Sequence, residues 1–322
     1  MKKVLGIFLA LAVLCGAAAL GTIPASANPD DDRPGKYSYG DLAYEIRYDA
    51  GGNPCIDIRP SLDASGDVVI PSSIEGIPVK RMIAVFYWNK KITSVQIPDS
   101  VEDISTLNFL SSSLTADYVF ISPSNPHLML SDGFLISKQD MKLIAYIGDS
   151  ATPSVPVGVK ILDDSAFDSH YRGVNFTSIT LPNTLEEFGW TPIARCDDLK
   201  ITIPESVKTI SHGIFFYCDN VVVTIPRDTT IISRPEDTNE YNAVFWYCEN
   251  PTIMGYAGSS AEAFAKEYGT GTAGEFAKEY EINFVEIQPQ IQAKVLFWNS
   301  WPSWAQAILR YLLFGWLWER WV

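Results

Sequence analysis

A short internal repeat, anchored on proline, is the feature that most constrains how this chain can fold. Each copy has alternating apolar residues before the proline, and in most copies apolar residues recur three and six positions after it. Five segments share this pattern: residues 67–74, 92–104, 176–188, 199–210 and 221–232. Residues 155–167 form a sixth, degraded copy, with Pro156 as its anchor. A recurring step of 22 to 27 residues is typical of proteins that stack equivalent units.

One copy shows the physical basis of the pattern. Val95 and Ile97 alternate with Ser94 and Gln96, which is the period of a strand with one buried face. Pro98 then ends the strand, because proline cannot donate a hydrogen bond to a ladder. A unit this small cannot bury its apolar face alone, so we expect the copies to stack around one shared interior. An antiparallel sandwich of short strands would explain the alternation, but not the recurring proline pattern.

The repeat resembles the BspA-like class of bacterial leucine-rich repeats. The resemblance rests on FTSITLP (176–182), on DSAF (164–167), and on the segments that end at Cys196, Cys218 and Cys248. It covers roughly residues 60 to 287. It implies a leucine-rich repeat solenoid with short parallel β-strands on one face, irregular or short-helix returns, a β-hairpin insertion and a helical C-terminal cap. Residues 105–118 and 227–242 depart from the pattern: the first lack the AFxxC element and the second contain a polar expansion.

The cysteine spacing follows the repeat. Cys196 and Cys218 are 22 residues apart, so we expect them at equivalent places in adjacent repeats, where buried cysteine acts as a small hydrophobic residue. A disulfide between stacked repeats is the alternative interpretation. Cys55 has no evident partner.

The N-terminal residues predict export. Lys2 and Lys3 precede the apolar run 4–20, and Ala25-Ser26-Ala27 provides the small residues that a signal peptidase recognises. We expect a signal peptide over residues 1–27 and therefore a secreted or cell-surface protein; an uncleaved anchor is the alternative.

The remaining chain divides into four predicted regions. An N-terminal leader and capping hairpin span 28–60, and leucine-rich repeats span 61–250 with a hairpin insertion at 119–148. A C-terminal capping repeat with helices spans 251–287, where AEAFAKEY (261–268) and AGEFAKEY (273–280) are rich in strong helix formers.

A tryptophan-rich amphipathic tail covers residues 288–322. It holds six of the nine tryptophans: Trp298, Trp301, Trp304, Trp316, Trp318 and Trp321. Its apolar stretch, 304–318, is interrupted by Gln306 and Arg310 and is shorter than the roughly 20 residues of a membrane span. Contact with a membrane interface or a partner is favoured. Docking on the repeats and a true span are the alternatives.

The composition favours a binding protein over an enzyme. The formal net charge of −14, without a Lys/Arg cluster, argues against nucleic acid as a partner. No catalytic motif, metal site or cofactor site is evident, and the three histidines are scattered. We expect adhesion to a protein or glycan ligand outside the cell through the outward strand positions. These are Ser94, Gln96, Ser178, Thr180, Lys200, Thr202, Val222 and Thr224. A structural envelope component anchored by its tail is the alternative, and an enzyme of unrecognised type is the third possibility.

Overall fold

The computed structural model describes residues 37–87, 89–105, 114–169, 173–210, 213–232, 244–269 and 282–287. Within them the chain is made of many short strands. The N-terminal elements are β1 (Tyr37–Tyr39), β2 (Leu42–Tyr48), β3 (Pro54–Ile58), β4 (Gly66–Val69), β5 (Ser73–Ile74), β6 (Ile77–Met82), β7 (Ile92–Ile97), β8 (Asp103–Ile104), the 3₁₀ turn η2 (Ala116–Tyr118) and β9 (Val119–Ile121).

Later elements include a three-stranded insertion and the repeat strands. The insertion comprises β10 (Leu128–Ser131), β11 (Phe134–Ser137) and β12 (Lys142–Tyr146). The repeats comprise β13 (Ile161–Leu162), β14 (Phe167–Asp168), β15 (Ser178–Ile179), β16 (Glu187–Phe188), β17 (Ile193–Ala194), β18 (Lys200–Thr202), β19 (Thr209–Ile210), β20 (Phe215–Phe216), β21 (Val222–Thr224), β22 (Thr230–Ile231), β23 (Phe245–Trp246) and β24 (Thr252–Gly255). Helix α2 (Ser260–Gly269) and β25 (Asn283–Glu286) follow.

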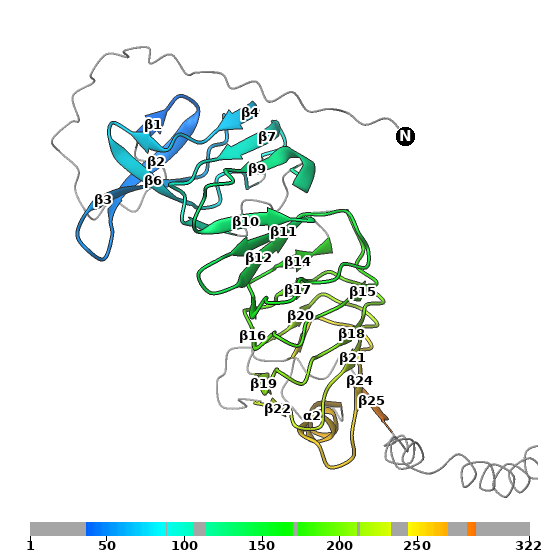
Figure 1. Ribbon diagram of the computed structural model, residues 1–322. Coiled ribbons are helices and arrows are strands. Elements are labelled where there is room, and N and C mark those ends of the chain that lie inside the picture. The colour runs from blue at the N-terminus through cyan, green and yellow to red at the C-terminus, as the bar shows by residue number, and fades with distance from the viewer. Residues whose placement is uncertain are drawn as a thin grey trace, which may run out of the picture. The chain divides into compact units, whose positions relative to one another are not determined.

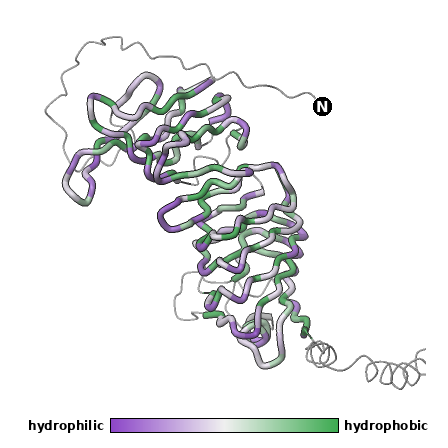
Figure 2. The backbone as a smooth tube through the Cα atoms, viewed as in Figure 1, coloured by the Kyte–Doolittle hydropathy of each residue, from purple (hydrophilic) through white to green (hydrophobic). Residues whose placement is uncertain are grey.

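Successive repeats pair in parallel at equivalent positions. One sheet has the order β15-β18-β21-β24-β25, and a second has the order β14-β17-β20-β23 (Figure 1). In the first sheet Ile179 pairs with Ile201, which is 22 residues later, and Val223 continues the same row. The recurring apolar position of the sequence is therefore one buried row in space. The tube in Figure 2 accordingly alternates between hydrophobic strand segments and hydrophilic turns.

The return segments differ from the sequence expectation. Irregular or short-helix returns were expected, but several form two-residue strands that pair in parallel, such as β13 with β16 and β19 with β22. The reason is an apolar residue five or six positions after each proline, which recurs in register. Leu162 and Phe188, each six positions after a proline, pair with each other, and Ile210 pairs with Ile231, both of which are buried. Among the described residues α2 is the single α-helix.

The N-terminal part begins with antiparallel strands. β1 pairs with β2 and β2 with β3, both antiparallel, after which β3 pairs in parallel with β6. The next repeat strands form a separate three-stranded sheet, β4-β7-β9. β9 begins at Val119, so residues 119–121 pair with repeat strand β7 rather than with the insertion to which the sequence analysis assigned them.

The expectation of one shared interior was wrong, because the buried apolar residues form two clusters. One cluster contains residues between 42 and 147, and the other contains residues between 134 and 265. The insertion contributes to both. In β11, Phe134 and Ile136 belong to the second cluster, whereas Leu135 between them belongs to the first. Because successive strand residues face opposite sides, this sheet has an apolar core on each face.

The C-terminal elements follow the last repeat. The first AKEY segment forms α2, which contacts β22, β24 and β25, and β25 pairs in parallel with β24. The second AKEY segment, the leader at 1–36 and the tail at 288–322 lie outside the described residues.

Candidate functional site

The predicted strand-face residues lie in two different sheets. Ser94 and Gln96 belong to β7. The other six residues lie on or directly after β15, β18 and β21. Among the described strands, β4-β7-β9 and β15-β18-β21-β24-β25 are separate sheets. These eight residues therefore do not form the continuous sheet face that the sequence suggested. The insertion between the two groups of repeats explains the interruption.

Six of the predicted residues do form aligned rows. Ser178 pairs with Lys200, Lys200 pairs with Val222, and Thr202 pairs with Thr224. Thr180 lies just after β15 and forms a parallel bridge with Ser154. We call this surface the strand face. Lys200 and Thr202 are exposed, while Val222 and Thr224 are half-buried.

Ser94 has a structural partner. The hydroxyls of Ser94 and Thr93 both donate hydrogen bonds to Oδ1 of Asp67, each at 2.7 Å. Those two hydrogen bonds lower the pKa of Asp67 below its ordinary value. Ser94 thereby links β7 to β4. Because its hydroxyl already donates to Asp67, that hydroxyl is less available to a ligand.

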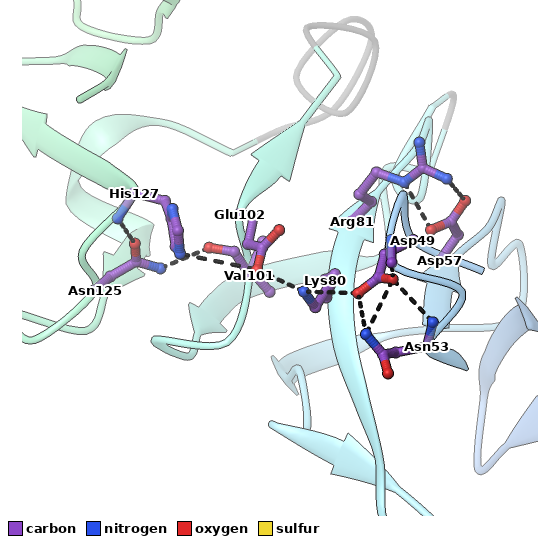
Figure 3. A network of polar contacts seen from close by, with 10 residues as sticks. Asp49, Asn53, Asp57, Lys80, Arg81, Val101, Glu102, Asn125 and His127 are labelled. Atoms are coloured by element: carbon purple, nitrogen blue, oxygen red, sulfur yellow. Dashed lines mark hydrogen bonds and ion pairs between the residues drawn. The ribbon is translucent and has the colours of Figure 1, made fainter. Parts of the chain in front are cut away.

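A polar network crosses the first repeats (Figure 3). Arg81 donates to both carboxylate oxygens of Asp57, at 2.8 and 2.6 Å, and Asp57 is 1% exposed. Lys80 Nζ lies 2.9 Å from Glu102 Oε1, and His127 Nε2 lies 3.9 Å from the same oxygen. Within the described ranges no hydroxyl or thiol hydrogen-bonds to the His127 imidazole. The network therefore links neighbouring repeats without forming a nucleophile–base pair.

In the described part of the chain, no group of three or more His, Cys, Asp or Glu side chains is placed to hold a metal ion. None of the described helices is long and apolar enough to cross a bilayer. The six tail tryptophans, Trp298, Trp301, Trp304, Trp316, Trp318 and Trp321, lie outside the described residues.

Sequence reasoning missed an aromatic surface on the β14-β17-β20-β23 sheet. Phe216 pairs in register with Trp246, and the next residue in each repeat is a tyrosine, Tyr217 and Tyr247. The Tyr217 and Tyr247 rings stack with centroids 4.9 Å apart at an interplanar angle of 10°. The ring centroids of Phe216 and Trp246 are 4.7 Å apart. Tyr217 is 48% exposed. We call these four residues the aromatic row.

A backbone feature produces this row. Phe215 and Cys218 are buried, yet the two residues between them both lie at the surface, which strict strand alternation does not allow. Tyr217 has φ of 51°, in the left-handed region, and this kink places two successive side chains outward. Tyr247 and Arg195 have φ of 53° and 55° at the equivalent positions. Left-handed conformations cost such residues free energy, so the surrounding repeats must hold them in place.

An acidic row follows the aromatic row along each repeat. It consists of exposed or half-buried carboxylates at the turns after the cysteines: Asp197, Asp198, Asp219 and Glu249. Asp197 Oδ1 accepts the backbone N–H of Asp219, and Asp219 Oδ1 accepts that of Glu249. Asp197 and Asp219 thus each hold the turn of the next repeat in place. In the described residues, none of the four forms an ion pair.

Buried cysteines support these turns from below. Cys196, Cys218 and Cys248 are free thiols with exposures of 1% or less. The backbone N–H of Cys196 donates to Cys218 Sγ at 3.3 Å, and that of Cys218 donates to Cys248 Sγ at 3.2 Å. Burial raises the pKa of the Cys248 thiol. The predicted equivalence of Cys196 and Cys218 is therefore present as a continuous hydrogen-bonded row.

Comparisons with known proteins identify the repeat. The family model described as BspA type leucine rich repeat region matches six copies, over residues 66–124 and 151–237. Among solved structures, a leucine-rich repeat protein from Eubacterium ventriosum is similar at 15% identity and a TM-score of 0.41. The similarity covers 60% of this chain and 49% of that one, so the chain spans about half its length.

Two other solved structures are similar at lower scores. The pneumococcal vaccine antigen PcpA has 11% identity and a TM-score of 0.31, over 78% of this chain and 98% of that one. A leucine rich cell surface protein from Faecalibacterium prausnitzii has 14% identity and a TM-score of 0.29, over 81% and 97%. No curated protein sequence matches the chain.

Proposed function

Because this chain belongs to the BspA-type leucine-rich repeat family, we propose that it is a non-catalytic, exported protein that binds a protein or glycan ligand through its strand face. The observation that carries the proposal is the in-register row of Ser178, Lys200 and Val222, beside the row of Thr202 and Thr224. Stacked repeats of this kind create extended surfaces on which many small contacts act together.

The architecture that we propose is a solenoid closed at its C-terminal end by α2. Two observations support it. Parallel pairing recurs one repeat apart in two sheets, and α2 contacts β22, β24 and β25. In addition, Ser260 at the start of α2 accepts the backbone N–H of Ile231 at 2.8 Å. Such a helix covers apolar side chains of the repeat that precedes it, which is the role of a solenoid cap.

Export is proposed on the N-terminal residues. Lys2 and Lys3, the apolar run 4–20 and the Ala25-Ser26-Ala27 site together have the pattern of a signal peptide. N-terminal sequencing of the protein recovered from culture medium or from the cell envelope tests this, since cleavage should leave Asn28 as the first residue. An intact Met1 in the exported protein would contradict it.

The binding experiment compares two matched triple variants of the full chain. The first, Lys200→Glu with Thr202→Arg and Thr224→Arg, places bulk and altered charge on the strand face. The control, Lys208→Glu with Thr209→Arg and Thr230→Arg, makes the same changes at exposed residues of the return strands. Each protein is tested on immobilised host matrix proteins, bacterial surface proteins and glycans.

We expect the first variant to lose binding that the control retains, while both keep the unfolding midpoint of the unmodified chain. Equal binding by both variants would contradict the strand face as the ligand surface. If removal of residues 288–322 abolishes association with cells while both triple variants retain it, the protein is an envelope component held by its tail.

A further inference from the structure

The aromatic row and the acidic row lie next to each other on one side of the repeats. Tyr217 and Asp219 are two residues apart in one repeat, and Tyr247 and Glu249 are two residues apart in the next. In-register pairing of β20 with β23 aligns the two repeats, so rings and carboxylates form two adjacent lines. This surface belongs to a different sheet from the strand face.

The surface is negatively charged. Asp197, Asp198, Asp219 and Glu249 contribute carboxylates that no described cation pairs with, in a chain of net charge −14. Each hydrogen bond from the next turn occupies one carboxylate oxygen and leaves the charge in place. A partner complementary to this surface therefore carries positive charge, and it must also cover the exposed Tyr217 ring and the half-buried Tyr247 ring.

The chain itself contains an example of the contact that such a partner would make. Arg195 lies at the position equivalent to Tyr217, one repeat earlier, and its guanidinium carbon is 5.4 Å from the Phe216 ring centroid. The same guanidinium donates to Asp168 Oδ2 at 2.6 Å. Carboxylate, guanidinium and ring thus form one unit, in which the cation lies over the ring and the acid accepts a hydrogen bond from one of its N–H groups.

We propose that the aromatic and acidic rows bind an arginine-rich segment of a partner protein. Each arginine of the segment repeats the arrangement of Arg195, with its guanidinium on the ring of Tyr217 or Tyr247 and its N–H groups on Asp219 or Glu249. Arginine fits better than lysine, because a planar guanidinium stacks on rings and can donate two N–H groups to one carboxylate. An ammonium is a compact charge without that planar fork. The inference goes beyond the proposed function, because it requires no ligand on the strand face.

The test measures peptide binding to the full chain by calorimetry at physiological ionic strength. The probes are a peptide of three Arg-Gly units, its Lys-Gly counterpart and the neutral sugar maltohexaose. The ring variant is Tyr217→Ala with Tyr247→Ala, and its control is Tyr48→Ala with Tyr118→Ala, since these tyrosines are 74% and 52% exposed elsewhere. The acid variant is Asp219→Asn with Glu249→Gln, which keeps the Asp219 oxygen that accepts the backbone N–H of residue 249.

We expect the ring variant to bind the arginine peptide roughly tenfold more weakly than the control, since two exposed cation–π contacts are removed. The acid variant should bind it several-fold more weakly with a shallower salt dependence, and the lysine peptide should bind the unmodified chain several-fold more weakly. Equal binding of the arginine peptide by all variants would overturn the proposal, because attraction to the net charge alone would then explain it. Loss of maltohexaose binding in the ring variant, with arginine binding unchanged, would also overturn it and assign the surface to a glycan.

The strand-face experiment remains independent of this one. Failure of the strand-face variants to alter binding contradicts the proposed function and leaves the arginine result unaffected. Unchanged peptide binding by the ring and acid variants contradicts this inference and leaves the proposed function in place.

Discussion

The backbone N–H of Cys196 donates a hydrogen bond to the sulfur of Cys218, 22 residues later and 3.3 Å away. Both residues are fully buried, so the sulfur satisfies a backbone group that water cannot reach. The cysteine row is thus both a packing element and a ladder of acceptors from one repeat to the next.

Replacement of Cys218 by alanine should reduce the free energy of unfolding by about 2–3 kcal/mol. The buried packing of the sulfur is lost, and the Cys196 N–H loses its hydrogen-bond acceptor. Cys55→Ala is the matched control, since the buried Cys55 thiol takes part in no described hydrogen bond. It should cost about 1 kcal/mol. Urea denaturation followed by far-ultraviolet circular dichroism measures both. Equal losses at the two positions would show that the acceptor role contributes nothing.

Asn125 should be more sensitive than an exposed asparagine. Its amide donates to the carbonyls of Pro98 and Val101, each at 2.9 Å, and its oxygen accepts the N–H groups of His127 and Leu128. Figure 3 shows the contacts with Val101 and His127. Asn125→Asp removes both donated bonds at a residue that is 1% exposed, so we expect a loss of about 2–4 kcal/mol.

The control for Asn125 is Asn220→Asp on the exposed turn row, which should change stability by less than about 1 kcal/mol. Thermal unfolding of the two variants tests the difference. Similar melting temperatures for both would contradict the structural role of Asn125.

Removal of Arg81 should leave a buried carboxylate without its partner. Asp57 is 1% exposed and receives both its charged hydrogen bonds from Arg81, whose side chain is 41% exposed. After allowance for that exposure, we expect Arg81→Ala to cost about 2–3 kcal/mol.

Lys160→Ala breaks the exposed ion pair with Glu186 and is the control, with an expected cost of about 0–1 kcal/mol. Denaturant unfolding distinguishes the two. If the charge of Asp57 is responsible, Asp57→Asn combined with Arg81→Ala should recover part of the loss.

Asp163 should make the protein less stable as the pH rises above about 4. Burial raises its pKa above the ordinary value, although Lys142 Nζ lies 3.3 Å from its Oδ2 and opposes the shift. Between the unfolded and folded pKa values, the folded state therefore holds a proton that the unfolded state has lost. The contribution of Asp163 to the free energy of unfolding therefore falls with pH across that window and is constant above it.

The Asp163→Asn variant should lose this part of the pH dependence when unfolding midpoints are measured from pH 3 to pH 7. Nuclear magnetic resonance titration of the Asp163 carboxyl should give a pKa above that of Asp67, whose pKa is lowered by two hydroxyl donors. A carboxyl of Asp163 that titrates below the one of Asp67 would contradict this assignment.

The sequence predicted the repeat strands well because their two determinants are local. Alternation placed Val95 and Ile97 in the core, and both are buried in β7. Proline ended the strands, and a spacing of 22 residues predicted that Cys196 and Cys218 occupy equivalent positions. Each of these inferences needs only the order of residues within one repeat.

The division into two cores was missed because it depends on the insertion. In β12 and the residue after it, Leu143 and Tyr146 face one cluster while Ile144 and Ile147 face the other. A run of apolar residues without alternation is the signal of a strand buried on both faces, and LIAYI (143–147) has that signal.

The aromatic row was missed for a different reason. Strand alternation permits one outward residue between two inward ones, whereas a left-handed residue at Tyr217 permits two. Paired aromatic residues before cysteine, FY in one repeat and WY in the next, were the available clue. The order of residues alone does not determine φ at those positions.

The left-handed residue before each cysteine has an evolutionary consequence. It turns the side chain directly before each buried cysteine toward the surface, so substitutions at that position leave the hydrophobic interior untouched. The surface residues at these places, Arg195, Phe216 with Tyr217, and Trp246 with Tyr247, already differ widely in size and charge. Lineages that carry this scaffold can diversify their recognition chemistry one repeat at a time, and a combinatorial library at these positions would sample new specificities on an unchanged frame.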